Sequence, residues 1–335
     1  MKNHKNLKGM KEIHVGEIEG FSLGHSQDEK GATGCTVALF QQGAVAGVDI
    51  RGGAPGTRET DLLKSENMVD RVHGILLTGG SAYGLDAAAG VMEYLEEQNI
   101  GFDVGVAKVP IVPGAVLFDL PIGNPKIRPD KAMGYAAAKN AGSKHGKAVA
   151  EGTVGAGTGA TVGKILGMDY AMKGGIGSYA VEIGGLKVGA IVAVNAFGDV
   201  LEQGETIAGV YDRKNQIFLH TEGVMVQGAY KEPFNGNTTI GIVVTNGKFT
   251  KPAMNKIASM SHNGYARALY PSHTMVDGDT IFAAATGEVE SDPSFVGHLA
   301  AVAVEKAIHR GIKAAKALHG VPAYQDIAGD HQQEE

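Results

Sequence analysis

One threonine in this chain lies where a polar turn meets an apolar strand, and it could act as a nucleophile. The run 233–240 reads PFNGNTTI, and 239–245 is β-branched and apolar, which predicts a buried strand starting at Thr238. If the bond after Asn237 were broken, Thr238 would carry both a hydroxyl and a free amine. An α-amine has an ordinary pKa of about 7.7 to 8.0, so it can accept the hydroxyl proton near neutral pH. The alternative is a simple hairpin turn, because Asn-Gly turns are common between strands.

Two acids separated by one glycine stand at the start of another apolar strand. Asp277-Gly278-Asp279 precedes residues 280–283, and Gly278 allows a tight turn that keeps both carboxylates beside the strand end. One carboxylate could hold the amine of Thr238 while the other orients the first, as in a catalytic triad. A solvated turn, or a weak hard-cation site that needs further oxygen ligands, is the alternative.

An asparagine and a lysine are further candidates. Asn195 interrupts the apolar run 192–198 and could donate to a developing oxyanion, a contribution of about 3 kcal/mol in a dry site, or it could end a strand in a turn. Lys164 closes a glycine-rich stretch that partly matches a phosphate loop, but Thr158 and Ile165 break the required spacing. We expect a glycine-rich wall that brings Lys164 to an active site, with a non-catalytic phosphate-ligand binding module as the alternative.

Other reactive side chains fit known motifs poorly. Ser81 resembles a nucleophile elbow, but Tyr83 stands where the second glycine is needed, so we predict a helix N-cap at Ser81 and a pocket residue at Tyr83. The histidines form no pair with a helical glutamate at metal-binding spacing, so no metal or other cofactor is predicted. We expect His262, His273 and His298 to be structural or surface residues.

Several segments together resemble the P1 family (S58-type) of self-processing peptidases. This group contains the L-aminopeptidase/D-amidase/esterase and the β-aminopeptidases, and the likeness is greatest to its nylon-oligomer hydrolase branch. The resemblance runs from about residue 20 to about residue 315 and rests on six blocks in order: Arg51–Ala54, Leu77–Leu85, Pro129–Gly134, Val194–Asn195, Gly236–Ile240 and His273–Ala283.

The resemblance implies that the chain cuts itself between Asn237 and Thr238, giving 1–237 and 238–335 within one hydrolase domain covering 1–335. It implies a four-layer α/β/β/α sandwich resembling the N-terminal nucleophile hydrolases with different connectivity. It also implies a homo-oligomer, a tetramer of cleaved heterodimers. Thr238 becomes the nucleophile, and the substrate is a short peptide, an amino-acid amide or a linear amide oligomer. A related alternative transfers the acyl group to an amino acid, as ornithine acetyltransferases do.

The same resemblance assigns roles to the other candidates. It makes Asn195 an oxyanion-hole donor, Lys164 an active-site lysine, and Asp277 and Asp279 the acids that orient the new terminus. Phe118 departs from the pattern, because the nylon-oligomer branch has a tyrosine there. The missing hydroxyl removes one hydrogen-bond donor from the expected substrate pocket.

Composition limits the possible partners and compartments. The net charge of −6 and the lack of a basic stripe argue against a nucleic-acid partner. Cys35 is the only cysteine, which excludes an intrachain disulfide and favours a reducing compartment, with the thiol in a buried strand. The segment Met1–Lys11 lacks the apolar core of a signal peptide, and no stretch is long enough to span a membrane, so we expect a cytoplasmic enzyme.

The apolar periodicity predicts elements that would position these residues in two packed sheets covered by helices. The expected strands are Cys35–Phe40, Ala44–Ile50, Ile75–Leu77, Ser178–Ile183, Val188–Val194, Ala208–Tyr211, Val224–Val226, Thr239–Thr245 and Thr280–Ala285. The expected helices are Leu85–Leu95, Lys131–Ala141, Pro252–Ala266 and Phe295–Leu318.

Overall fold

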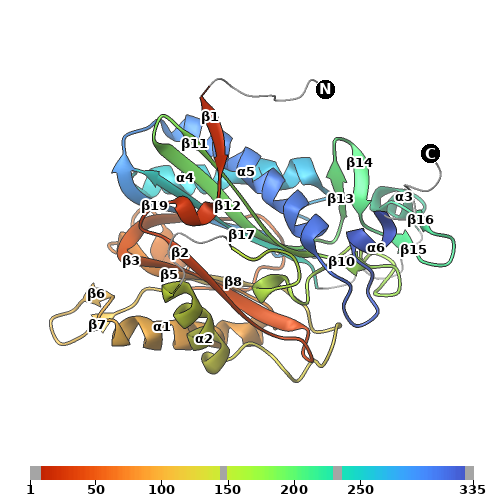
Figure 1. Cartoon of the computed structure of the whole chain (residues 1–335), viewed down its shortest axis with the longest axis horizontal. Helices are drawn as coiled ribbons and strands as arrows, with labels where there is room; N and C mark the ends of the chain where they lie inside the picture. The colour runs from red at the N-terminus through yellow and green to blue at the C-terminus, as the bar shows by residue number, and fades with distance from the viewer. Residues whose placement is uncertain (1–8, 144–148, 229–235, 329–335) are drawn as a thin grey trace.

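The computed structural model describes residues 9–143, 149–228 and 236–328. Two layers of strands lie between two layers of helices, with α4 and α5 on one side and α1 and α2 on the other (Figure 1). The predicted four-layer α/β/β/α arrangement is therefore confirmed. The helices that cover the strands are α1 (Ala87–Glu97), α2 (Lys131–Gly142), α4 (Lys251–Ala268) and α5 (Pro293–Ala314).

The strand layers are parts of one ten-stranded sheet in the order β1-β11-β12-β17-β19-β3-β5-β8-β4, with β2 paired to β3. The long strand β3 joins them, because residues 35–39 pair with β5 and residues 45–50 pair with β19. The two strands predicted here are thus one strand with an irregularity after Leu39. The strands are β1 (Met10–Ile13), β2 (Ser22–Asp28), β3 (Thr33–Ile50), β4 (Thr57–Arg58), β5 (Arg71–Thr78), β8 (Gly114–Val116), β11 (Gly175–Ile183), β12 (Leu186–Asn195), β17 (Thr238–Gly247) and β19 (Thr280–Val289).

Side chains alternate between two cores along the buried strands. In β17, Ile240, Ile242 and Val244 enter the core between the strand layers, whereas Val243 enters the core beneath α4 and α5. Strand β5 alternates in the same way: Ile75 and Leu77 enter the core between the strand layers, whereas Leu76 packs against α1 and α2. Both faces of these strands are covered, which explains their nearly continuous apolar sequence.

One predicted strand is a helix. Val224–Val226 belongs to α3 (Thr221–Val226), in which Val224 is buried but Val226 is 82% exposed. A strand would bury both residues on one face, because its side chains repeat every two positions. The Asp199 carboxylate accepts hydrogen bonds from the backbone N–H and hydroxyl of Thr221, which hold the first helical turn.

The last predicted helix is shorter at its end than expected. Helix α5 starts at Pro293, where the Asp292 carboxylate caps it by accepting from the N–H of Phe295. It ends at Ala314 rather than at Leu318, because Ala315 takes an extended backbone conformation. Within the described ranges, no helix is both long enough and apolar enough to cross a membrane.

Short strand pairs complete the fold. The predicted strand Ala208–Tyr211 is divided between β14 and β15. The short elements are β6 (Phe102–Asp103), β7 (Lys108–Val109), β9 (Thr161–Val162), β10 (Met172–Lys173), β13 (Asp199–Glu202), β14 (Glu205–Ala208), β15 (Tyr211–Asp212), β16 (Ile217–Phe218), β18 (Leu269–Tyr270) and α6 (Tyr324–Ala328).

Candidate active site

Three strand ends bring the predicted residues together. Thr238 is the first residue of β17 and pairs directly with Asn195, the last residue of the antiparallel strand β12. Strand β19 runs parallel to β17, so the loop that carries Asp277 and Asp279 enters at the same end. Asn237 forms an isolated parallel bridge with Asp277, which extends this pairing past the strand ends.

All five candidate side chains are buried. Asn195 is 0% exposed, Lys164, Asp277 and Asp279 are each 1% exposed, and Thr238 is 5% exposed. The alternative of a solvated Asp-Gly-Asp turn is therefore wrong. Burial weakens screening by water, so charges and hydrogen bonds in this cluster act on one another strongly.

The Asn195 amide has a fixed orientation. Its Oδ1 accepts hydrogen bonds from Thr161 N and from Lys164 Nζ, both at 2.9 Å. Two donors require an oxygen at this position, so the amide nitrogen faces the opposite way. Nδ2 donates to Phe118 O at 3.2 Å and to Gly236 O at 3.4 Å. The donor group of Asn195 thus points towards the segment that precedes Thr238.

The Lys164 ammonium lies in the same cluster. Nζ donates to Asn195 O at 3.0 Å and to Gly236 O at 3.2 Å. Burial lowers the pKa of Lys164 to about 7, which the Asp277 charge opposes and the neighbouring Lys173 charge reinforces. Near neutral pH this amine can therefore either donate or accept a proton.

The bond between Asn237 and Thr238 lies at the centre of the cluster. Asn237 O accepts a hydrogen bond from Gly278 N at 3.0 Å, and it is also contacted by the Thr238 hydroxyl. A Cβ atom at residue 278 would lie 2.7 Å from Thr238 Oγ1, so only glycine leaves room for this hydroxyl. Residues 233–235 of the predicted motif lie outside the described part of the chain.

The Asp279 carboxylate links the nucleophile strand to a histidine. Oδ1 accepts from Thr239 N at 2.8 Å, while Oδ2 accepts from His273 N at 3.0 Å and lies 2.9 Å from His273 Nδ1. Sequence reasoning missed this contact. His262 packs against the His273 ring with centroids 4.8 Å apart, and its Nε2 donates to Asp49 O, a structural role as predicted.

The Asp277 carboxylate is held by Thr274 in its own loop and by Phe197, which follows β12. Oδ2 accepts from the N–H of Thr274 at 3.1 Å and from its hydroxyl, and Oδ1 accepts from Phe197 N at 3.2 Å. Burial, followed by the charge of Asp279, raises the pKa of Asp277 to about 6. Each acid of the pair therefore has one oxygen fixed by residues 273–274 and the other fixed by a backbone N–H of another segment, Phe197 for Asp277 and Thr239 for Asp279.

Two buried charges next to the cluster were not predicted. Lys173 Nζ donates to Thr158 O at 2.8 Å and to Ala160 O at 2.6 Å, and burial lowers its pKa to about 7. The Asp119 carboxylate accepts from Gly80 N at 2.7 Å, and burial raises its pKa to about 6. Lys173 stands in no recognisable sequence motif. Asp119 directly follows Phe118, a predicted pocket residue, and this position could have marked it as a candidate.

The two predicted pocket residues differ in their surroundings. The Phe118 ring packs on Gly236, where an added Cβ atom would lie 2.3 Å from the ring. Tyr83 is 61% exposed and stacks with the Arg128 guanidinium, whose central carbon lies 3.8 Å from the ring centroid. None of the hydrogen bonds among the described residues connects Tyr83 to Thr238.

Two other sequence candidates lie outside the cluster. Ser81 is not a helix N-cap, because Gly80 occupies that position and Ser81 lies inside the following turn with φ +54°. Cys35 is buried in a strand as predicted. Burial raises the pKa of its thiol, and the thiol donates to Met133 O.

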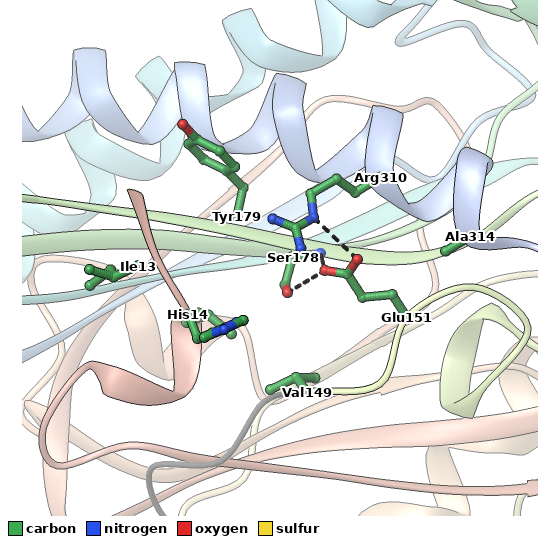
Figure 2. Close-up of a pocket in the computed structure, with 9 residues that line it drawn as sticks. Ile13, His14, Val149, Glu151, Ser178, Tyr179, Arg310 and Ala314 are labelled. Carbon is green, nitrogen blue, oxygen red and sulfur yellow. Dashed lines mark hydrogen bonds and ion pairs between the residues drawn. The ribbon is translucent and has the colours of Figure 1, made fainter. Parts of the chain in front are cut away.

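A cavity of about 290 Å³ lies away from these residues, beside β1, β11 and α5 (Figure 2). Its polar groups bind one another: the Glu151 carboxylate accepts from the N–H and hydroxyl of Ser178 and from Arg310 Nε. The cavity contains none of the predicted site residues. We therefore place the candidate active site at the strand ends around Thr238.

Known proteins resemble this chain over most of its length. The sequence profile of peptidase family S58 matches residues 14–325. An uncharacterized aminopeptidase of Mycobacterium tuberculosis is 39% identical, with 94% of this chain and 95% of that protein covered. The 6-aminohexanoate-oligomer endohydrolase of Paenarthrobacter ureafaciens is 33% identical, with 82% of this chain and 75% of that enzyme covered.

Solved structures share the fold at low sequence identity. The L-aminopeptidase D-Ala-esterase/amidase from Ochrobactrum anthropi, described as a new variant of the Ntn hydrolase fold, has a TM-score of 0.73 at 17% identity. That comparison covers 96% of this chain and 93% of the other. A β-aminopeptidase from Burkholderia sp. has a TM-score of 0.69 at 19% identity, covering 97% and 95% of the two chains.

Proposed function

This chain belongs to peptidase family S58, and from that premise we propose that it is an amide hydrolase that cuts itself between Asn237 and Thr238. The new N-terminal threonine then acts as the nucleophile towards substrates. The observation that supports this proposal best is the contact of the Thr238 hydroxyl with the carbonyl oxygen of Asn237, in a buried site that also holds two carboxylates and a lysine.

Self-cleavage begins with attack of Thr238 Oγ1 on the carbonyl carbon of Asn237. The new C–O bond forms as the carbonyl electron pair moves onto Asn237 O. The C–N bond then breaks, and the Thr238 nitrogen leaves with the proton that the hydroxyl gives up. We assign the relay of this proton to Asp279, which accepts from the N–H of the adjacent Thr239 at 2.8 Å. Water hydrolyses the resulting ester and leaves a carboxylate on Asn237.

Substrate hydrolysis uses the free terminus. The Thr238 amine accepts the proton of its own hydroxyl, which attacks a substrate amide. Asn195 Nδ2 and Lys164 Nζ, which contact Gly236 O in the uncut chain, become donors to the oxyanion. The Thr238 amine returns the proton to the leaving amine, and water releases the acyl group. Asp277 and Asp279 orient the terminus throughout.

We assign short peptides, amino-acid amides or linear amide oligomers as the substrate class. The names of the relatives support this range, because they include aminopeptidases and an endohydrolase of 6-aminohexanoate oligomers. Phe118 offers an apolar ring without a hydroxyl beside Gly236, which favours apolar substrate chains there. We further propose a cytoplasmic homo-oligomer of the cleaved heterodimer.

The first test compares wild type with Thr238→Ala and Thr238→Ser by intact mass and denaturing gel. In proportion to the total of 34.7 kDa for 335 residues, wild type should give fragments of about 24.5 and 10 kDa. Thr238→Ala should stay whole, because it has no nucleophilic oxygen, whereas Thr238→Ser keeps one and should still be cut. A wild type that remains uncut after long incubation would refute the proposal. Cut wild type should also hydrolyse amino-acid amides or 6-aminohexanoate oligomers.

A further inference from the structure

The uncut chain places different hydrogen-bond donors on two successive carbonyl groups. Gly278 N–H donates to the oxygen of the bond to be cut, Asn237 O, at 3.0 Å. Asn195 Nδ2 and Lys164 Nζ instead donate one residue upstream, to Gly236 O, at 3.4 and 3.2 Å. Among the described residues, neither Asn195 Nδ2 nor Lys164 Nζ thus donates to Asn237 O, the oxygen that becomes negative during self-cleavage.

Building on the self-cleavage proposed above, we propose that the backbone N–H of Gly278 is the oxyanion donor of that step. When Thr238 Oγ1 attacks, one electron pair of the Asn237 carbonyl moves onto its oxygen. The Gly278 N–H already points at that oxygen, so the hydrogen bond strengthens without any rearrangement. Asn195 and Lys164 become oxyanion donors only for substrates, after the segment ending at Asn237 has been released.

The donating peptide group is held from both sides. The same peptide unit that supplies Gly278 N–H carries Asp277 O, which accepts a hydrogen bond from Ala54 N at 2.8 Å. On either side of it, the Asp277 and Asp279 side chains are tied to neighbouring backbone N–H groups. A dipole fixed in this way costs no reorganisation when charge develops opposite it.

The proposed role of residue 278 also requires that it has no side chain. A Cβ atom there would lie 2.7 Å from Thr238 Oγ1 and 2.8 Å from Ala54 O. Asn237 is 2% exposed, so the N–H acts in a site that excludes water. Glycine therefore lets one residue contact the carbonyl oxygen with its N–H while the attacking hydroxyl lies alongside.

Replacing Gly278 with glycolic acid tests the proposal directly. This amide-to-ester change, made by nonsense suppression in cell-free translation, exchanges the N–H for an oxygen and adds no atoms. Self-cleavage, followed by intact mass, should slow about 100- to 1000-fold relative to wild type, the usual effect of removing one oxyanion donor. The matched control is glycolic acid at Gly204, an exposed residue with no described residue beyond its chain neighbours within 4 Å of its Cβ direction; this protein should cleave at the wild-type rate.

The possible results separate this proposal from the function on which it rests. Uncut wild type would refute self-cleavage itself. Cut wild type together with a Gly278 ester that is cut equally fast would refute only the role of the N–H. A second measurement is independent of whether the ester folds: Asn195→Ala should slow substrate hydrolysis by a larger factor than self-cleavage. An equal or larger effect on self-cleavage would also overturn the proposal.

Discussion

At the scale of single residues, the site contains a lysine whose burial disfavours its charge. The pKa of Lys164 falls to about 7 in the folded chain, against an ordinary value of about 10.4. Between these values the unfolded chain holds a proton that the folded chain lacks, so the stability contributed by this site rises with pH. Below pH 7 both states are protonated, and the dependence disappears.

A stability measurement checks this sign. In the uncut Thr238→Ala background, we expect the free energy of unfolding with Lys164, minus that with Lys164→Met, to rise by about 1 kcal/mol per pH unit from pH 7 to about pH 10. Urea unfolding of both proteins at each pH provides the difference and cancels the other titrating groups. A difference that does not change with pH would mean that Lys164 stays charged when buried.

His273 offers a second test at this scale, because it is the partner of the Asp279 carboxylate. Its backbone has φ +59°, a conformation that asparagine tolerates better than most residues. His273→Asn places an amide nitrogen close to the Nδ1 position and should keep self-cleavage within a few-fold of wild type. His273→Ala loses a hydrogen bond to a carboxylate, and about 10- to 100-fold slower cleavage is expected. Equal rates for the two variants would contradict this role.

Local signals in the sequence pointed to several of the candidate residues but missed residues whose role depends on contacts formed by folding. Thr238 and Asn195 each mark a change in an apolar strand, and Asp277 and Asp279 flank a glycine. His273 and Lys173 have no such context, because their importance comes from contacts that appear only after folding.

At the scale of elements, glycines set the distance between α5 and the strand beneath it. A Cβ atom on Gly177 of β11 would lie 2.1 Å from Ala307 O and 2.3 Å from Gly311 N. Both are backbone atoms of α5, so the helix would have to move. Gly177→Ala should therefore lower the free energy of unfolding by about 1–3 kcal/mol, as overpacked sites do.

Urea unfolding of the uncut Thr238→Ala protein measures this effect. The control is Gly223→Ala in α3, where no described residue outside the local helical turn comes within 4 Å of the added Cβ and alanine favours the helix. It should leave stability unchanged or raise it slightly. A loss at Gly177 no greater than at Gly223 would show that α5 is not limited by this contact.

Most elements followed from local pattern, and the exceptions have physical causes. β17 was predicted because 239–245 is β-branched and apolar. Val224–Val226 is also apolar but forms a helix, because Asp199 in β13 holds its first turn through Thr221. The full length of β3 could not be predicted either, because it is set by pairing with both β5 and β19, which belong to different strand layers.

At the scale of the whole molecule, the bond between Asn237 and Thr238, which we propose is cut, lies at the start of a central strand. β17 lies between β12 and β19, and all ten of its residues are buried. Residues 238–335 also contribute α4 and α5, which cover one face of the sheet (Figure 1). The proposed cleavage would remove a single covalent bond and leave these contacts in place, so the two fragments should stay together.

Native mass spectrometry of the cut protein tests this expectation. We expect species that contain both fragments in equal number, separating only in denaturant. Uncut Thr238→Ala serves as the control and should show the same assembly with one chain in place of two. Free fragment 238–335 under native conditions would contradict the expected association. The layered fold was anticipated from the pattern of strands and helices together with the family resemblance, whereas the parallel pairing of β17 with β19 leaves no local sequence signal.

Because of the position of this bond, the ratio of cut to uncut chain on a denaturing gel would report folding as well as activity. The groups around Asn237 come from β12, from the start of β17 and from the loop before β19, which meet only when that part of the sheet is complete. A molecule that cuts itself there keeps a permanent record of having folded once. The fraction of cut chain in a cell extract would then count the molecules that reached the native state, including any that unfolded afterwards.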